Sequence, residues 1–562
     1  MSGAMAPEIA NVAGESRWPR GLLLLTVALA IAAPLAMYSG RVPGLGEFDY
    51  LIYYRLLFYN DFTNSLAMLA ALLVALAMRP VRNWITHAAD WVSRHPWQTC
   101  AVAFVAMAIA ARVVYQGFPL AMDEYAPLLQ ARIFAHGDIA ITYPRELLDR
   151  MVVPGFQGSF IHVDRETGNA ISGYWPGLAL LMTPFAWFRA EWMLNPLLGA
   201  AGLWLIGDLA RLASGSEQAR GWAMLAALAC PQYTISAMSY YAMTGLLTLN
   251  LLFLWLLLRP GARDAFLAGI VGSVSLVMHN PVPHALFALP VGIWLLTSEE
   301  RRRKLIPLAA GYVPLTALLG LGWPLLTSEM GLRPTAVAAA DAGFVASWIE
   351  RLDQIFVLPG LDMLIVRSYA AWKTLIWAAP GLLLVAFLVK PQHALQRVLL
   401  AAFLITFAFY FLVPFDQGHG WGYRYIHSAW GLIPIATGVF ATKVDDDGGR
   451  LLAAAMFAGL LATPAFLWTT RETISTSIAL QPATPDQGKA LVFIANRPSL
   501  YTLDLIRNYP GEGDRILRMW SRGADKDARL AARIVPDAVP YSADERGSTW
   551  TNKMQTPVPR KP

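Results

Sequence analysis

The chain has 562 residues, of which 56% are hydrophobic and only 15% are charged, and its mean hydropathy is +0.44. A soluble domain carries about 25% charged residues, so this composition excludes a soluble globular protein and indicates a polytopic membrane protein. The net charge of +6 does not indicate a nucleic-acid-binding protein, because the basic residues fall in short loops between apolar runs, where they orient membrane helices.

Apolar runs recur along the chain and predict about 13 membrane spans, since a span needs about 20 apolar residues and fewer where protein covers it. They lie at about 21–39, 64–78, 97–116, 195–210, 221–238, 242–258, 266–280, 282–297, 305–326, 373–389, 398–414, 425–442 and 451–468. The first has basic residues before it, as in a signal peptide, but its length favours an uncleaved anchor. The expected fold is therefore an all-α polytopic membrane protein.

The basic clusters alternate with these spans, so that every cluster falls on one side of the membrane. They are Arg17/Arg20, Arg79/Arg82/Arg94, Arg211/Arg220, Arg259/Arg263, "RRRK" at 301–304, Lys390/Arg397 and Lys443/Arg450. The positive-inside rule makes that side cytoplasmic. We therefore expect a multi-pass protein of the cytoplasmic (inner) membrane, with the N-terminus inside and the tail from about residue 469 outside.

A long loop, about 117–194, opens on the outer side with "MDEYAPLLQARIFAHG". Asp123 can cap a helix through this stretch, with Pro127 tolerated in the first turn and Gly137 as a stop. One face of that helix is mainly apolar, which predicts an amphipathic helix lying on the membrane; the residues are Tyr125, Leu128, Leu129, Arg132 and Ile133. A second interfacial helix is expected in "YWPGLALLMTPFAWF", residues 174–188.

A second outer constellation is "FDQGHGWGYRYIH", residues 415–427, between two spans. It gathers Asp416, His419, Trp421, Tyr423, Arg424 and His427 around three glycines. Arg424 offers a permanent charge and a planar fork of donors suited to phosphate. At the head of a membrane helix such a charge is costly unless it faces a partner or an aqueous cavity. Taken alone, Arg424 fits a lipid headgroup anchor as well as a substrate ligand.

The order of these features resembles the GT-C superfamily of integral-membrane glycosyltransferases, which contains the lipid A aminoarabinose transferases and the protein O-mannosyltransferases. The similar features are a membrane helix ending in "AMDEYAPLLQARIFAHGDI", the later "GYWPGLALLMTPF", the many spans and the outer tail. The resemblance covers roughly 97–300 and extends more loosely to 470. Trp175 stands where relatives usually have a proline, and the two spans before residue 97 are additions to the usual core.

The resemblance implies transfer of a sugar from a polyprenyl-phosphate-linked donor to an extracytoplasmic hydroxyl or amine of a lipid, glycan or protein, with inversion at the anomeric carbon. Such an acceptor needs a general base, and the departing lipid phosphate needs a fixed cation. Asp123 is the expected base, and Glu124 is either its support or part of a metal site. Arg424 is the expected phosphate ligand, helped by Tyr423 and His419, with Arg132 and Arg112 in reserve. Tyr125, Tyr174, Trp175 and Trp421 are candidates for contact with the sugar or the acceptor.

Each of these features also has a simpler interpretation. An Asp-Glu pair at a helix start is often a plain cap, and interfacial aromatic residues are first of all a belt. His279 and His284, in "MHNPVPH", are expected to be hydrogen-bonded residues of a hairpin turn rather than metal ligands. No His/Cys cluster has zinc spacing, and "VDDDGGR" lacks the final Glu of a calcium loop. No cofactor is predicted with certainty, although Mg or Mn at the acidic pair stays open.

The predicted organisation has three parts. Residues 1–96 are a cytoplasmic segment with two extra spans, and 97–468 are the catalytic core with the loop 117–194. Residues 469–562 form an outer tail, in which strands at 490–495 and 515–520 and a helix at 525–535 suggest a small α/β module; from 543 onward the composition is typical of disorder.

Two other classes of function stay open. A lipid-linked sugar transporter would also be polytopic, but it should show repeated halves with charges at mid-membrane, and no internal repeat is found. An O-antigen ligase or polymerase would carry several arginines in a large late loop, whereas here the main early loop carries the acids.

Overall fold

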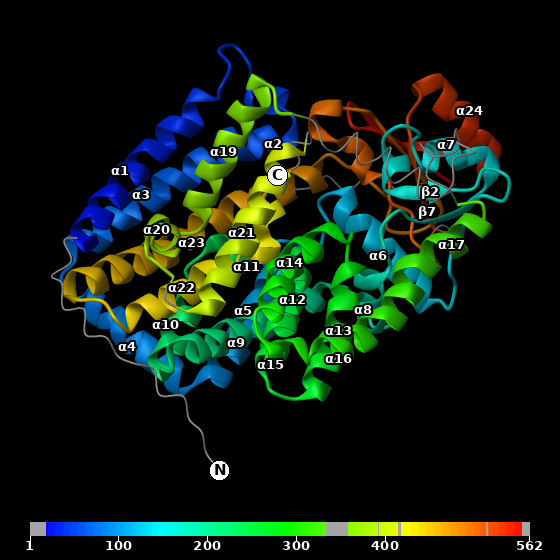
Figure 1. Cartoon of the computed structure of the whole chain (residues 1–562). Coiled ribbons are helices and arrows are strands. Elements are labelled where there is room, and N and C mark those ends of the chain that lie inside the picture. The colour runs from blue at the N-terminus through cyan, green and yellow to red at the C-terminus, as the bar shows by residue number, and fades with distance from the viewer. Residues whose placement is uncertain (1–17, 333–357, 392, 414–417, 513–514, 553–562) are drawn as a thin grey trace.

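The computed structural model describes residues 18–332, 358–391, 393–413, 418–512 and 515–552 (Figure 1). The first half contains α1 (Trp18–Ser39), α2 (Ile52–Arg55), α3 (Asp61–Ala77), α4 (Val81–Arg94), α5 (Pro96–Val113), α6 (Met122–Ala135), α7 (Leu148–Met151), α8 (Gly177–Ala186), α9 (Leu194–Ser214), α10 (Glu217–Leu228), α11 (Pro231–Ser236) and α12 (Met243–Leu258). The second half contains α13 (Ala262–Leu276), α14 (Val282–Leu296), α15 (Glu299–Arg302), α16 (Leu305–Leu315), α17 (Gly322–Glu329), α19 (Leu361–Trp377), α20 (Pro380–Leu388), α21 (Ala394–Leu412), α22 (Leu432–Ala441), α23 (Asp446–Ala479) and α24 (Ala524–Ile534).

The strands are short and form three sheets. They are β1 (Ile141–Thr142), β2 (Ile161–Val163), β3 (Asn169–Ser172), β4 (His419–Gly420), β5 (Gly422–Tyr423), β6 (Ala490–Ile494), β7 (Ile516–Trp520), β8 (Val539–Asp544) and β9 (Gly547–Thr551). Among the described residues the sheet orders are β1-β3-β2, β4-β5 and β7-β6-β9-β8, and there only the pair β6 and β7 is parallel. The fold is thus a large helical bundle with small sheets at one end.

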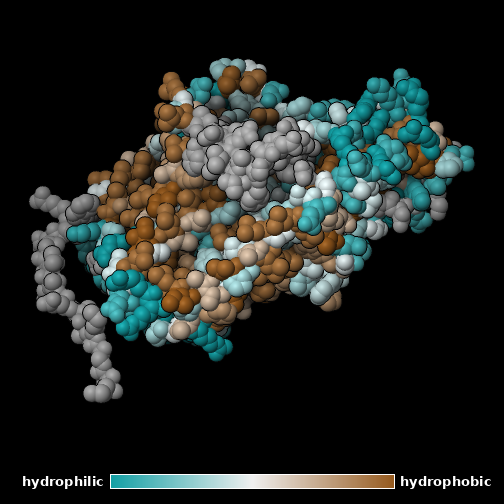
Figure 2. Space-filling model, turned by 45° about the vertical axis from the view of Figure 1, so that its right-hand side comes forward, coloured by the Kyte–Doolittle hydropathy of each residue, from teal (hydrophilic) through white to brown (hydrophobic). Residues whose placement is uncertain are grey.

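The bundle is that of a multi-pass membrane protein. Within the described residues, seven helices are long and apolar enough to cross a membrane, or eight if the pair α19 and α20, bent by 109°, is one span. Figure 2 shows a broad hydrophobic surface over the helical part, with hydrophilic surface towards its ends. The predicted count of about 13 is not confirmed, because several predicted spans are short helices inside the bundle, such as α12, α14 and α22.

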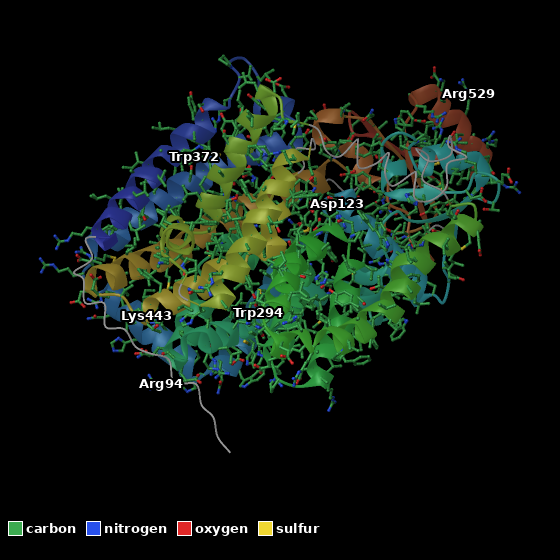
Figure 3. The ribbon with its side chains drawn as sticks, in the orientation of Figure 1. Arg94, Asp123, Trp294, Trp372, Lys443 and Arg529 are labelled. Atoms are coloured by element: carbon green, nitrogen blue, oxygen red, sulfur yellow. The ribbon has the colours of Figure 1, made fainter. Side chains whose placement is uncertain are left out.

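The basic clusters gather at the end of the bundle away from Asp123, as Arg94 and Lys443 show in Figure 3. There Arg20 and Arg82 bind Asp447 and Asp446 at 2.9 Å and 2.7 Å. These contacts join α1 and α4 to the start of α23, so basic residues distant in sequence share one face. This arrangement is the one predicted from the alternation of basic loops, whereas the compartment on each side stays a prediction.

The outer loop and the tail build one unit at the opposite end, with a common hydrophobic core. Leu129, Ile133 and Met151 of the loop pack in one cluster with Phe493 and Met519 of the tail. The predicted strands and helix of the tail are present as β6, β7 and α24. The prediction of disorder from 543 is wrong for 547–551, because β9 pairs with both β6 and β8.

The helix α6 is enclosed rather than laid on a membrane surface. Eleven of its 14 residues are buried, because it packs on α8 along one side and shares a core with the tail on another. The predicted amphipathic surface helix is therefore wrong in its environment, although its bounds are close. The second predicted helix is present as α8, which is too short to span.

Candidate functional site

The acidic pair stands in the first turn of α6, and the two carboxylates diverge. Successive helix residues are about 100° apart around the axis, so Asp123 and Glu124 face different surroundings. The helix begins at Met122 with Ala121 as its N-cap. Asp123 is thus not the predicted cap, because its carboxylate binds side chains outside the helix, those of Arg424 and Tyr174.

Asp123 forms an ion pair with Arg424, whose Nη1 lies 2.5 Å from Asp123 Oδ2. The side chains are only 11% and 10% exposed. The hydroxyl of Tyr174 donates to Asp123 Oδ1, so both carboxylate oxygens are engaged. The structure therefore joins three predicted site residues that are up to 301 positions apart.

Arg424 is placed by the tight β4–β5 hairpin. Gly422 at its turn has φ +69°, and a Cβ there would lie 2.1 Å from Gln232 Oε1, so only glycine fits. The guanidinium lies over the Tyr241 ring, 5.0 Å from its centroid. Gly422, one of the glycines in this segment, is thus required by the turn that positions Arg424.

Glu124 faces into the protein and is fully buried. Its Oε1 accepts from the Tyr115 hydroxyl at 2.7 Å and the Tyr240 N–H at 2.8 Å. Its Oε2 accepts from the Leu120 N–H at 2.5 Å and the Ala121 N–H at 3.4 Å. Glu124, rather than Asp123, therefore accepts hydrogen bonds from the backbone N–H groups just before α6. Glu124 lines neither of the two cavities described next.

Two cavities meet at the ion pair. The "hairpin cavity", of about 360 Å³, is bounded by the α13–α14 turn at 279–283 and by α12 and α21. The "tail cavity", of about 520 Å³, is bounded by Tyr501 and Asp504 of the tail and by α2. Asp123, Phe160 and Arg424 line both. The base and the cation predicted from sequence thus sit where two ligands could meet.

The hairpin cavity is mainly apolar away from the ion pair. Met243, Leu246, Phe409 and Val413 line it, together with the predicted Tyr174 and Trp175. His279 lines it too, stacked on the Tyr174 ring with centroids 4.2 Å apart. Within the described residues His279 Nδ1 is buried without a hydrogen-bond partner, so the prediction of a hydrogen-bonded turn residue fails for that nitrogen.

His284 behaves as the simpler interpretation predicted. Its Nδ1 lies 2.6 Å from Asn250 Oδ1, and its Nε2 pairs with the Tyr312 hydroxyl. It lines neither cavity. His284 is therefore a hydrogen-bonded core residue.

Burial and charge set the protonation of the site. Burial alone would raise the pKa of the Asp123 carboxyl, but the Arg424 guanidinium and the Tyr174 hydroxyl hold that pKa below its usual value. Burial lowers the pKa of His279 to about 4, and burial raises the pKa of Glu124 to about 7. Near neutral pH, Asp123 is a carboxylate and His279 a neutral ring.

Several predicted residues lie outside both cavities. Trp421 donates its indole N–H to the Tyr115 hydroxyl at 2.8 Å, and that hydroxyl donates to Glu124. The Tyr125 hydroxyl bonds the backbone of Asn508 in the tail. Tyr423 is buried beside His419, and of these two only His419 lines a cavity, the tail cavity.

The two reserve arginines also have other partners. Arg132 lies nine residues along α6 from Asp123, about 13 Å at 1.5 Å per residue, and it binds Glu191 and Glu512 at 2.8 Å and 3.2 Å. Arg112 lies over the Trp192 ring at 5.5 Å. Neither lines a cavity at the ion pair, and Asp416 lies outside the described residues.

Sequence reasoning missed the residues that other segments bring to the site. Tyr241, Tyr501, Asp504 and Tyr53 all line the tail cavity. None stands in a motif with the acidic pair, so no sequence pattern marked them. Of the three tyrosines only Tyr241 adjoins a predicted span, the one at 242–258, and Tyr53, Tyr501 and Asp504 carried no such signal.

A metal site does not fit the acidic pair. The oxygens of Glu124 accept from two backbone N–H groups of 120–121, from Tyr240 and from Tyr115, and Asp123 pairs with a cation of the protein. In the part of the chain that the structure describes, no group of three or more His, Cys, Asp or Glu residues could hold a metal ion.

The fold is similar to that of a solved structure. The crystal structure of ArnT from Cupriavidus metallidurans bound to undecaprenyl phosphate matches with a TM-score of 0.52 and 13% identity, over 82% of this chain and 99% of ArnT. The apo form of that ArnT gives a TM-score of 0.49 and 13% identity, over 81% and 98%. No protein-family model and no curated protein sequence matches the chain. At this identity the likeness concerns the fold, and it confirms the fold that the resemblance to the GT-C superfamily implied.

Proposed function

We propose that the protein is a membrane glycosyltransferase that moves a sugar from a polyprenyl-phosphate donor to an acceptor hydroxyl or amine. The observation that carries the proposal is the Asp123–Arg424 pair at the junction of two cavities. A carboxylate base and a fixed cation are the two groups that this transfer requires. The shared fold with an ArnT bound to undecaprenyl phosphate supports the lipid part of the donor.

The hairpin cavity suits the phosphate end of such a lipid. Its walls are apolar along α12 and α21 and cationic at Arg424, which matches a prenyl chain joined to a phosphate. His279, held neutral by burial, can donate one ring N–H to a phosphate oxygen. Tyr174 lies between His279 and Asp123 and keeps the carboxylate aimed at the junction.

The resting ion pair gives the reaction an order. Donor phosphate competes for the Arg424 guanidinium, and as that contact forms Asp123 loses its strongest partner and becomes a better base. Asp123 then takes the proton of the acceptor O–H or N–H while the acceptor atom attacks the anomeric carbon. The bond from that carbon to the phosphate oxygen breaks, and the lipid phosphate leaves with the electron pair beside Arg424. Attack from the side opposite the phosphate gives inversion.

Glu124 supports this site through the backbone. It holds the start of α6 through the N–H groups of residues 120 and 121, and it joins that start to Tyr240 and Tyr115. Its role in the proposal is therefore to position Asp123. We place the reaction on the extracytoplasmic face, because the basic loops gather at the other end of the bundle.

The test uses purified full-length protein in lipid nanodiscs with a panel of undecaprenyl-phosphate-linked sugars. Mass spectrometry follows release of undecaprenyl phosphate, first with water and then with envelope lipids as acceptors. We expect release from at least one donor and its loss in Asp123→Asn. No release from any donor, together with no accumulation of a polyprenyl-phosphate sugar in cells lacking the protein, would refute the proposal.

A further inference from the structure

The tail cavity contains side chains that the proposed reaction does not use. Tyr501 and Asp504 come from the tail, Tyr53 from α2, and Phe156 from the outer loop. These segments meet only in the folded chain, around Asp123, which also lines the hairpin cavity. Its volume of about 520 Å³ lies within the roughly 300–1,000 Å³ of small-molecule sites.

The tail segment that forms this wall is held firmly. The Tyr125 hydroxyl accepts from the Asn508 N–H at 2.9 Å, and the Tyr143 hydroxyl donates to the Asn508 carbonyl at 2.8 Å. Gln157 donates its amide to the carbonyls of Leu503 and Ile506, both at 3.1 Å. The tail is therefore a fixed wall of the site, and the side chains it presents have defined positions.

Asp504 is an acid with unused hydrogen-bonding capacity in this wall. Its Oδ1 is buried and accepts no hydrogen bond from the described residues. The nearby Arg507 directs its guanidinium to the carbonyls of Asp504 and Leu120, at 2.6 Å and 3.1 Å. Burial raises the pKa of Asp504 to about 7, although Arg507 opposes this rise. A ligand hydroxyl or amino group would supply the missing donor.

Aromatic rings line the same cavity as this acid. The Tyr501 ring stacks on Phe156 with centroids 5.7 Å apart, and Tyr53 lies 6.3 Å from Tyr501. Flat apolar faces beside a few polar groups suit a sugar ring, which has C–H faces and a hydroxyl rim.

We infer that the tail cavity is a saccharide subsite, in which Asp504 binds a ring hydroxyl or amino group and Tyr501 and Tyr53 contact the ring. This inference rests on the proposed function, because the subsite adjoins the reacting pair. The ring belongs either to the donor or to a glycan acceptor, and both present the same chemistry. The tail is then a determinant of sugar specificity rather than an appendage.

The test compares Asp504→Asn and Tyr53→Leu with Asp486→Asn, a control on an exposed tail carboxylate. Full-length proteins in nanodiscs are assayed with the donor panel, and folding is checked by thermal unfolding. At pH 8, where most Asp504 is ionised, we expect Asp504→Asn and Tyr53→Leu to raise KM about tenfold or more, with a smaller change in kcat. The amide oxygen of Asn is a weaker acceptor than a carboxylate, and Tyr53→Leu removes a contact face. Hydrolysis of the donor by water shows whether the ring in the subsite belongs to the donor or to the acceptor. If the variants raise KM for the donor in hydrolysis, the ring belongs to the donor. If they raise KM only when an acceptor is present, the ring belongs to the acceptor.

A binding measurement keeps this inference separate from the proposed function. Saturation-transfer NMR uses methyl glycosides of glucose, galactose, mannose, N-acetylglucosamine and 4-amino-4-deoxyarabinose. We expect at least one signal with wild type and Asp486→Asn, and its loss in Asp504→Asn. Signals that persist in Asp504→Asn, or no signal with any glycoside, would overturn the subsite even if Asp123→Asn abolishes transfer. A signal lost in Asp504→Asn supports the subsite even if no donor turns over.

Discussion

Asp123→Asn tests the ion pair, and the structure predicts a cost in both stability and rate. The substitution leaves Arg424, only 10% exposed, without its counter-charge. Breaking a buried pair by removing one partner costs about 3–5 kcal/mol, and the two adjoining cavities admit water, so we expect the lower end of this range. Transfer should fall on the order of 10²–10⁴-fold, the usual contribution of a general base.

A double-mutant cycle separates the two effects. Arg424→Gln combined with Asp123→Asn removes both charges, so the free energy of unfolding should recover by about 2 kcal/mol or more relative to Asp123→Asn. Transfer should not recover, because neither base nor cation is present. Stability is measured by thermal unfolding in nanodiscs and transfer by release of undecaprenyl phosphate.

Two results would contradict this reasoning. Folded Asp123→Asn with wild-type transfer would remove Asp123 from catalysis and leave it as a structural partner of Arg424. A double variant that stays as unstable as Asp123→Asn would show that the loss comes from the Tyr174 contact or from the helix start rather than from the unpaired charge.

Three further predictions concern the phosphate ligand, the start of α6 and the topology. Arg424→Lys keeps the charge but loses the planar fork, so donor turnover should fall at least tenfold while thermal unfolding stays near wild type; wild-type turnover would remove Arg424 as the phosphate ligand. Glu124→Gln should lower the free energy of unfolding by about 1–3 kcal/mol, because an amide NH₂ cannot accept from the surrounding N–H groups, and KM should stay unchanged. Burial raises the pKa of Glu124 from 4.5 to about 7, so between these pH values the unfolded chain loses a proton that the folded protein keeps. The free energy of unfolding of wild type should therefore fall as pH rises through this window. If Glu124→Gln shows the same pH dependence, another group causes it. A cysteine at 303 should resist an impermeant thiol reagent in intact cells, whereas one at 165 or 545 should react; labelling at 303 would reverse the topology.

The sequence by itself determined the class of the protein and the type of its site. Composition and apolar runs require a membrane bundle, because apolar segments of this length are stable only in lipid or in a buried core. The alternation of basic loops predicted which ends lie together, and the contacts of Arg20 and Arg82 agree. Arg424 was selected because an arginine at the head of a membrane helix is costly without a partner, and Asp123 because the reaction implied by the resemblance needs a general base. The two prove to be each other's partner.

Only the tertiary structure decided how the two acids divide their roles and what else lines the site. Asp123 and Glu124 are neighbours in sequence, but the helix points their side chains in different directions. The backbone N–H groups of residues 120, 121 and 240 donate to Glu124. Apolar patterning also could not distinguish a lipid-facing helix face from one covered by the tail, which is why α6 was placed on the membrane surface. Tyr53, His279 and Asp504 reach the cavities from segments far apart in the chain. Local patterns carry no information on such contacts, because they form only when the loop, the tail and the first helices pack together.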